Sequence, residues 1–300
     1  MRQDRRITES PTDRALGHLR DRAPRVVMPE SDEPRIREAA ERLEALGLPR
    51  PLSADDAGPA ERYVPHLLRN RPGLKPALAL RMLERPLIRA AAMVAAGEGQ
   101  ALVAGAEAPT RRVIEAAQLA IGPAEGVATP SSFFLMRMPD GRAFVFADCA
   151  ATVAPDAATL ADIARASAAS AQALLGRAEV ALLSFSTGTS GTGPTVDTVR
   201  AAAELLRDAD FPVVGPVQAD AALNPVIAAR KGLEGGGGAN VLVFPSLDAG
   251  NIAYKLIQEL AGAQALGPIL QGFARPVCDL SRGASVDDIV NATILTLALG

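Results

Sequence analysis

The residues with the clearest chemical potential lie near the carboxyl end of the chain, in the string D-L-S-R-G-A-S-V-D-D at 279–288. A predicted helix begins within this string, so Ser281, Arg282 and Asp288 surround a helix N-terminus. A hydroxyl, a fixed cation and a carboxylate beside helix N–H groups that favour anions form a candidate phosphoryl site. The same string predicts a capping box, with Ser285 at the N-cap and Asp288 accepting its amide, and both interpretations stay open.

A second candidate site is the glycine-rich string S-F-S-T-G-T-S-G-T-G-P-T at 184–195, which follows an apolar run and precedes a predicted helix. Ligands of open α/β sheets bind beyond the carboxyl ends of strands, where helix amides can contact a phosphate. The string lacks the Gly-Lys-Ser/Thr of a P-loop and the dinucleotide-binding fingerprint. Because of the string's position between a strand and a helix, Ser186 and Thr187 are candidate phosphate-binding residues. The string is explained equally well as an ordinary connecting loop. Similar polar residues follow the apolar run before 245–251.

The elements that must position these residues are strands alternating with helices. A Pro139-Asp140-Gly141 turn predicts one antiparallel hairpin between 131 and 148. Elsewhere, a parallel connection needs a crossover element, so the alternation indicates a mainly parallel α/β sheet. A length of 300 residues leaves room for two domains. The predicted strands fall at 25–31, 101–105, 180–186, 212–220 and 239–246, and the longest predicted helix at about 155–176.

Composition argues against several classes of function. The formal net charge is −3 and only 3% of residues are aromatic, so neither a basic field nor stacking platforms for nucleic acid are expected. Cys149 and Cys278 have no second Cys or His at ligand spacing, and we expect no metal site. The charged first residues and the lack of a long apolar run predict a cytoplasmic protein without a membrane segment.

Several strings resemble the phosphate acetyl/butyryltransferase family in their order and spacing. The resemblance is specific over roughly 85–300 and weaker toward the N-terminus, where only V-V-M-P-E-S-D-E-P-R and L-L-R-N-R-P-G are similar. It implies reversible transfer of an acetyl group between coenzyme A and inorganic phosphate, by thiolate attack in a ternary complex. Coenzyme A is then a substrate, and no bound cofactor or metal is implied. The strings are F-V-F-A-D-C-A, L-S-F-S-T, P-V-Q-A-D-A-A-L, F-P-S-L-D-A-G-N-I-A-Y-K-L and G-P-I-L-Q-G-F-A-R-P-V-C-D-L-S-R-G-A-S-V-D-D-I-V.

The resemblance also implies a role for individual residues. Asp288 would deprotonate the thiol, Arg282 would hold the phosphate and Ser281 would assist at the transition state. Arg69 would supply a second phosphate-binding cation. These roles fit the chemistry, because a thiol with a pKa near ~8.5 is mostly protonated at neutral pH and needs a base. Taken without the resemblance, Arg69 is as well explained as a helix-surface residue.

The chain departs from the family pattern in two places. Where the family carries an arginine facing the substrates, this chain has Glu115, and Arg111 and Arg112 lie one turn earlier. Either of these two arginines is a candidate to replace the missing cation, since residues three or four apart share a helix face. The chain also has little between Gly47 and Tyr63, so we expect a first domain truncated near 48–63, with loss of an edge strand.

The architecture implied is a two-domain α/β/α fold like that of the isocitrate and isopropylmalate dehydrogenases, with the active site in the cleft between domains. The first domain would comprise 1–123 plus 268–300, and the second, 124–267, would form a homodimer. Alternatives are the same reaction on a longer, butyryl-like acyl group and a non-catalytic homologue that binds coenzyme A or an acyl phosphate. A nicotinamide-dependent dehydrogenase is disfavoured, because nothing in the sequence resembles its metal-binding aspartate cluster.

Overall fold

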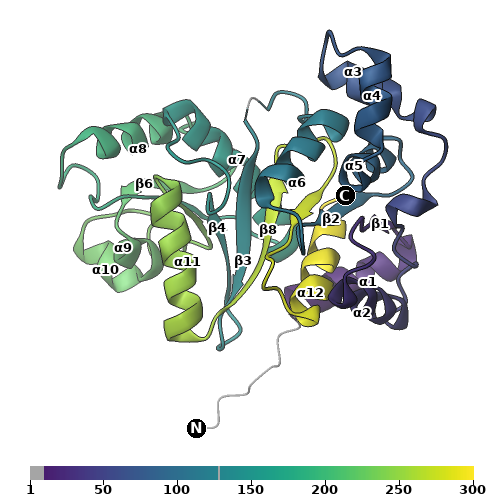
Figure 1. Cartoon of the computed structure of the whole chain (residues 1–300). Coiled ribbons are helices and arrows are strands. Elements are labelled where there is room, and N and C mark those ends of the chain that lie inside the picture. Colours follow the sequence, from purple (N-terminus) through teal and green to yellow (C-terminus); the bar gives the residue numbers. More distant parts are fainter. Residues whose placement is uncertain (1–9, 128) are drawn as a thin grey trace.

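The computed structural model describes residues 10–127 and 129–300, and a nine-stranded sheet lies at its centre (Figure 1). The strand order is β1-β2-β9-β8-β3-β4-β7-β5-β6. Five of the eight strand pairings are parallel, which confirms the mainly parallel α/β sheet. The strands are β1 (Val26–Val27), β2 (Ala101–Ala104), β3 (Ser131–Arg137), β4 (Ala143–Ala147), β5 (Val180–Leu183), β6 (Val213–Val217), β7 (Val241–Val243), β8 (Gln264–Gln271) and β9 (Val277–Asp279).

The two parallel groups of strands run in opposite directions, because three antiparallel pairings lie between them. Cys278 of β9 lies opposite Ile269 of β8, which lies opposite Phe133 of β3. Phe133 in turn lies opposite Ala147 of β4. The carboxyl ends of β9 and β4 are therefore level with each other on the two sides of the β3–β8 pair, where loops from distant parts of the chain can meet.

Helices cover both faces of this sheet, and seven of the twelve α-helices of the described residues carry proline in the first turn, where its fixed φ suits the helix. They are α1 (Pro11–Arg22), α2 (Pro34–Ala45), α3 (Val64–Asn70), α4 (Pro76–Leu83), α5 (Pro86–Ala95), α6 (Thr110–Ala116), α7 (Ala157–Leu175), α8 (Pro194–Glu204), α9 (Ala219–Leu223), α10 (Pro225–Arg230), α11 (Leu247–Ala261) and α12 (Val286–Leu297). Short turns of other helix types are η1 (Ala54–Asp56), η2 (Ala60–Arg62) and the π-helical η3 (Ala117–Ile121).

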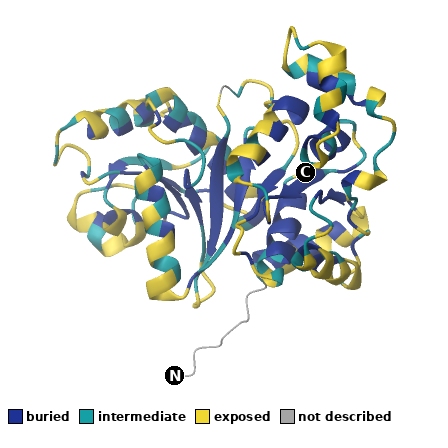
Figure 2. Ribbon diagram, in the orientation of Figure 1, coloured by how far each residue is buried: buried dark blue, intermediate teal, exposed yellow. Residues whose placement is uncertain are grey.

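Alternate strand residues bury their side chains on opposite faces, as a pleated strand requires. Phe133 belongs to a cluster that runs the width of the sheet beneath α1, α2, α7, α8 and α12. On the other face the buried residues form two clusters. Leu102 packs beneath α3–α6, whereas Phe134 packs beneath α9–α11. Figure 2 shows the strands buried and the outer sides of the helices exposed. This helix–sheet–helix layering agrees with the predicted α/β/α architecture.

The predicted hairpin and the longest predicted helix are confirmed. β3 and β4 pair antiparallel on either side of the Pro139-Asp140-Gly141 turn, and Gly141 has the positive φ that the turn needs. α7 occupies almost the whole of the helix predicted at about 155–176, and Gly176 ends it in the left-handed conformation.

Two N-terminal segments differ from the sequence-based expectation. The charged leader contains a helix, α1, which starts at a capping box formed by Ser10 and Asp13 and packs on α12. The segment between Gly47 and Tyr63 forms η1, η2 and an isolated bridge from Leu52 to Val27 at the edge of the sheet. The expected truncation of this segment and loss of an edge strand stay predictions.

The sheet continues without interruption across the predicted domain boundaries. β1, β2 and β9 come from 1–123 plus 268–300, and β3 to β7 come from 124–267. The exact division into these two domains stays a prediction. Within 10–127 and 129–300, no helix is long and apolar enough to cross a membrane, and no group of acidic, His or Cys side chains has a metal-binding arrangement.

Candidate functional site

A cavity of about 460 Å³ lies between α6 and α11, on the face of the sheet where the helices form two groups. Its size is typical of small-molecule sites. Its walls come from the loops after β2, β4 and β9, from α6 and α11, and from the middle of β3 and β8. The lining side chains include Thr110, Arg111, Phe134, Cys149, Asn251, Tyr254, Asp279, Ser281 and Arg282.

Two guanidinium groups from different segments of the chain line this cavity. Arg111 is the second residue of α6, and Arg282 lies in the β9–α12 loop (280–285) beside Ser281. All three side chains are exposed to solvent. Because arginine binds phosphate oxygens through a planar fork of N–H groups, this pair of cations suits a phosphate or an acyl phosphate.

Asp279 is a buried acidic group in the wall of the same cavity. It is the last residue of β9, it is only 1% exposed, and its Oδ1 has no hydrogen-bond partner within the described residues. Burial raises the pKa of Asp279 to about 6; the neighbouring Thr110 side chain opposes this increase, and the charge of Glu30 adds to it. Asp279 can therefore exchange a proton near neutral pH.

The loops after β2 and β9 approach each other as closely as backbones can. The amide of Leu280 donates to the carbonyl of Ala104 at 2.6 Å. Gly105 has a φ of +107°, and a Cβ atom there would lie 2.5 Å from Asp279 Oδ1 and 2.7 Å from the Leu280 nitrogen. This contact requires glycine and brings the Arg111 and Arg282 sides of the cavity together.

The loop after β4 forms the opposite wall around a second buried carboxylate. Asp148 is 2% exposed and accepts hydrogen bonds from the Ser132 hydroxyl and from the amides of Ala151 and Thr152, at 3.1 and 2.8 Å. The carbonyl of Cys149 accepts from Asn251 of α11 at 3.2 Å. Burial, together with the neighbouring Asp148 charge, raises the pKa of the Cys149 thiol, so the thiol stays protonated.

The predicted residues near 281–288 separate into two groups. Ser281 and Arg282 line the cavity, whereas Asp288 is not among its lining residues. Asp288 forms the predicted capping box: its amide donates to Ser285 Oγ at 3.2 Å, and its Oδ2 accepts from the Ser285 amide at 3.0 Å. Its Oδ1 accepts from Gln264 Nε2 at 3.1 Å. The capping interpretation is confirmed, and the role of Asp288 as a base stays a prediction.

The other predicted phosphate-binding residues also lie outside the cavity lining. Arg69 is exposed on α3. Ser186 is fully buried and uses its hydroxyl within the glycine-rich loop, accepting from the Gly191 amide at 2.8 Å. The Thr187 hydroxyl accepts from the Gln218 amide at 3.1 Å. Their predicted contacts with substrate stay predictions.

The structure distinguishes the two arginines proposed to compensate for Glu115. Arg112 forms an exposed ion pair with Glu115 at 3.0 Å, and both line a different, more apolar cavity beside Pro86. Arg111 lines the cavity that contains Arg282. Arg111 is therefore the stronger candidate for the missing cation.

Sequence reasoning did not single out Thr110, Asn251, Tyr254 or Asp279. Asn251 and Tyr254 share one side of α11, and Tyr254 stacks on Phe134 with ring centroids 4.2 Å apart. The polar stretch at 245–251 indicated this region, but it did not identify individual side chains. Asp279 is the first residue of the string at 279–288, and only its burial in the fold makes it chemically unusual.

Comparison with known proteins places the fold and the cavity in a class of α/β proteins that transfer acyl groups. A phosphotransacetylase from Streptococcus pyogenes has a structure with a TM-score of 0.86 and 32% identity, covering 95% of this chain and 98% of that one. A family model described as phosphate acetyl/butaryl transferase matches residues 53–297. The chain belongs to this family of acyltransferases, as the sequence resemblance predicted.

Two relatives show that family members differ in length. The phosphate acetyltransferase of Paracoccus denitrificans is 41% identical over 296 residues, which is 90% of this chain and 93% of the relative. The phosphate acetyltransferase of Nitrosomonas europaea is 40% identical over 302 residues, and there the match spans only 43% of the relative. This chain therefore corresponds to one part of some longer family members.

Proposed function

We propose that this chain is a phosphate acetyltransferase, which moves an acetyl group reversibly between coenzyme A and inorganic phosphate. The observation that carries the proposal is the joint placement of Arg111, Ser281 and Arg282 on one cavity in a member of this family. Relatives named phosphate acetyltransferase favour an acetyl group over a longer acyl chain and catalysis over binding alone. We also propose that the reaction takes place in the cytoplasm.

In this proposal the phosphate end of acetyl phosphate lies between Arg111 and Arg282. Their guanidinium groups neutralise the oxygens that gain charge as the bond from the carbonyl carbon to the phosphate oxygen breaks. Ser281, adjacent to Arg282, donates its hydroxyl proton in a hydrogen bond to the same group or to the carbonyl oxygen. The aromatic pair of Phe134 and Tyr254 forms the apolar wall beside the acetyl group.

The coenzyme A thiol needs a base before it can attack. We assign that role to Asp288, whose Oδ1 contacts only the Gln264 amide group among the hydrogen bonds of the described residues. The thiol proton passes to this oxygen, the sulfur electron pair forms the C–S bond, and phosphate leaves with the electrons of the C–O bond. Since Asp288 is outside the present cavity lining, the transfer requires the first turn of α12 to approach the substrates.

The test is release of coenzyme A from acetyl-coenzyme A in the presence of phosphate, followed with a thiol reagent. The same assay with butyryl-coenzyme A measures the preference for chain length, and arsenate in place of phosphate tests transfer to an oxyanion acceptor. We expect phosphate-dependent release that is faster with the acetyl substrate. Faster release from the butyryl substrate would change the substrate assignment, and no release from either would disprove the proposed activity.

We further propose that the protein is a homodimer that uses α11. Ile252, Leu256 and Leu260 lie at helical spacing on this helix and are 57%, 52% and 82% exposed. A row of exposed aliphatic side chains is typical of a surface covered by a partner. Light scattering should give twice the mass of the 31.0 kDa chain. A Leu260→Glu variant should give the monomer mass, and a monomeric wild-type protein would contradict the proposal.

A further inference from the structure

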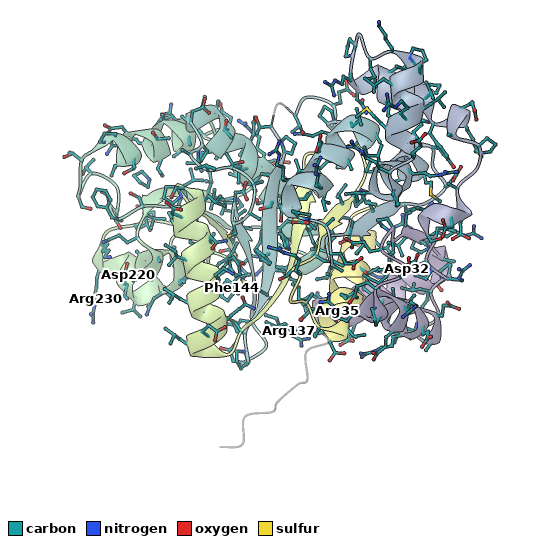
Figure 3. All side chains as sticks on the ribbon, in the orientation of Figure 1. Asp32, Arg35, Arg137, Phe144, Asp220 and Arg230 are labelled. Atoms are coloured by element: carbon teal, nitrogen blue, oxygen red, sulfur yellow. The ribbon has the colours of Figure 1, made fainter. Side chains whose placement is uncertain are left out.

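Two loops position the cations of the cavity, and side chains from 29–35 contact both loops. The β2–α6 loop (105–109) leads directly into Arg111, and the β9–α12 loop carries Arg282. The distance between the two guanidinium groups therefore depends on how these loops are held. Figure 3 labels Arg35, which comes from the first turn of α2 and lies beside the C-terminal segment that contains α12.

The Arg35 guanidinium binds three backbone carbonyls in the two loops. Its Nη1 donates to the carbonyls of Arg282 and Ala284, each at 2.8 Å, and its Nη2 donates to the carbonyl of Ala106 at 3.2 Å. Its Nε donates to Glu33 Oε1 at 2.8 Å, which fixes the plane of the group. Arg35 thus connects the backbone of the proposed phosphate-binding residue to the loop on the other side.

Glu30 holds the second loop from the same segment. Its Oε2 accepts from the amides of Gly105 and Ala106 at 2.9 and 2.8 Å, and its Oε1 accepts from Glu107 and Ala108 at 3.0 and 2.7 Å. Four consecutive amides that point toward one carboxylate form a concave anion-binding backbone. Here the protein's own carboxylate fills that concavity, so these amides are not free for the substrate phosphate.

We propose that Arg35 and Glu30 are positioning residues that set the separation of the two cations of the phosphate site. The inference rests on the proposed function, because it assigns the phosphate to Arg111 and Arg282. A displacement of about 1 Å in a catalytic arrangement can cost on the order of 100-fold in rate. A residue that only stabilises the fold would lower the melting temperature without a selective effect on one substrate.

The kinetic test uses Arg35→Ala, with Arg35→Lys as the conservative variant. We expect Arg35→Ala to raise the KM for phosphate by about tenfold or more and to change the KM for acetyl-coenzyme A much less. Lysine keeps the charge but not the planar fork, so Arg35→Lys should recover part of the loss. Arg20→Ala is the matched control. Arg20 also binds a backbone carbonyl, because its Nε donates to the Leu46 carbonyl at 2.7 Å, but this bond lies at the other end of α2.

A second measurement does not depend on activity. Hydrogen exchange of the substrate-free protein should be faster in peptides that contain 105–109 and 280–285 in Arg35→Ala, and faster in 105–109 in Glu30→Gln, but unchanged there in Arg20→Ala. If Arg35→Ala exchanges like wild type in both loops, or raises both KM values equally, the proposal is overturned. An inactive wild-type enzyme with the expected exchange changes would disprove the proposed reaction and leave the positioning of the loops supported.

Discussion

Arg111 and Arg112 are neighbours in the sequence with different surroundings, which allows a matched comparison. Arg111 lines the cavity, whereas Arg112 forms an exposed ion pair with Glu115 that contributes only ~0–1 kcal/mol to stability. Arg111→Ala should raise the KM for phosphate by roughly 10- to 100-fold through loss of a charge-assisted contact. Arg112→Ala should leave it unchanged. Steady-state kinetics on both variants check this. Equal changes in the KM for phosphate would mean that the structure does not distinguish Arg111 from Arg112 as the replacement for the missing cation.

Asp288 combines a structural contact that is observed with a proton transfer that is proposed. An amide oxygen can still accept from the Ser285 amide, so Asp288→Asn should keep the fold and the helix cap. Acyl transfer should fall by ~10² to 10⁴ because the amide cannot take the thiol proton. Turnover and thermal unfolding are measured together. Near-normal turnover with a lowered melting temperature would show that Asp288 is a capping residue only.

The buried carboxyl of Asp279 makes the stability of the fold depend on pH. Its pKa is raised from 3.8 to about 6, so its stabilising contribution is fully present below about pH 3.8 and is lost as the pH rises through about 6. An increase in pKa from 3.8 to about 6 corresponds to on the order of 3 kcal/mol. Asp279→Asn should therefore become more stable relative to wild type between pH 4 and pH 7, with no further gain above.

Chemical denaturation at several pH values measures this difference for Asp279→Asn. Asp21→Asn, at an exposed position in α1, is the control and should show no such trend. A constant difference between the Asp279 variant and wild type across the range would contradict the raised pKa.

The sequence identifies those site residues whose chemistry depends on their immediate neighbours in the chain, and it does not identify those whose chemistry depends on distant contacts. Ser281 and Arg282 are adjacent and their chemistry is visible in the string itself, so the sequence identifies them. The unusual pKa of Asp279 depends on burial against Gly105 and on the charge of Glu30, 249 positions earlier, which no local pattern reveals. Likewise, only the fold separates Arg111 from Arg112.

At the scale of elements, the contact between the β2 and β9 ends makes Gly105 irreplaceable. Gly105→Ala should cost more than the ~1–3 kcal/mol expected for a strained positive φ, because the new Cβ would also meet Asp279 and Leu280. Gly97→Ala is the matched control, since Gly97 has a φ of +82° with nothing within 4 Å of a Cβ. Equal unfolding free energies for the two variants would mean that the loops can separate freely.

Elements were predictable where their signal is local. The hairpin follows from its Pro-Asp-Gly turn, and α7 follows from nineteen residues of helix-favouring sequence. α1 was missed because its apolar face is small, comprising Ala15, Leu16 and Leu19, and is buried only when the fold places it against α12 and α7. The pairing of β1 with β2 and of β2 with β9 joins residues far apart in the chain, which spacing alone cannot indicate.

On the scale of the whole molecule, the cavity has walls from both predicted domains, and the role proposed for Asp288 requires movement of α12. Closure would exclude water from a labile acyl phosphate. Saturating coenzyme A with phosphate should raise the melting temperature by mass action and should slow hydrogen exchange at both 186–195 and 281–288. Protection at 281–288 alone would place coenzyme A away from the glycine-rich loop and would make that loop a connector.

The buried thiol of Cys149 has a consequence for the chemistry that its cavity permits. It lies in the wall of a chamber proposed to hold an activated acetyl group, a setting in which an ionised cysteine would capture that group. Burial and the adjacent Asp148 keep the proton on its sulfur. An acetyl group held in this cavity would therefore face a protonated sulfur at Cys149, and the incoming thiol of coenzyme A would meet no rival nucleophile there.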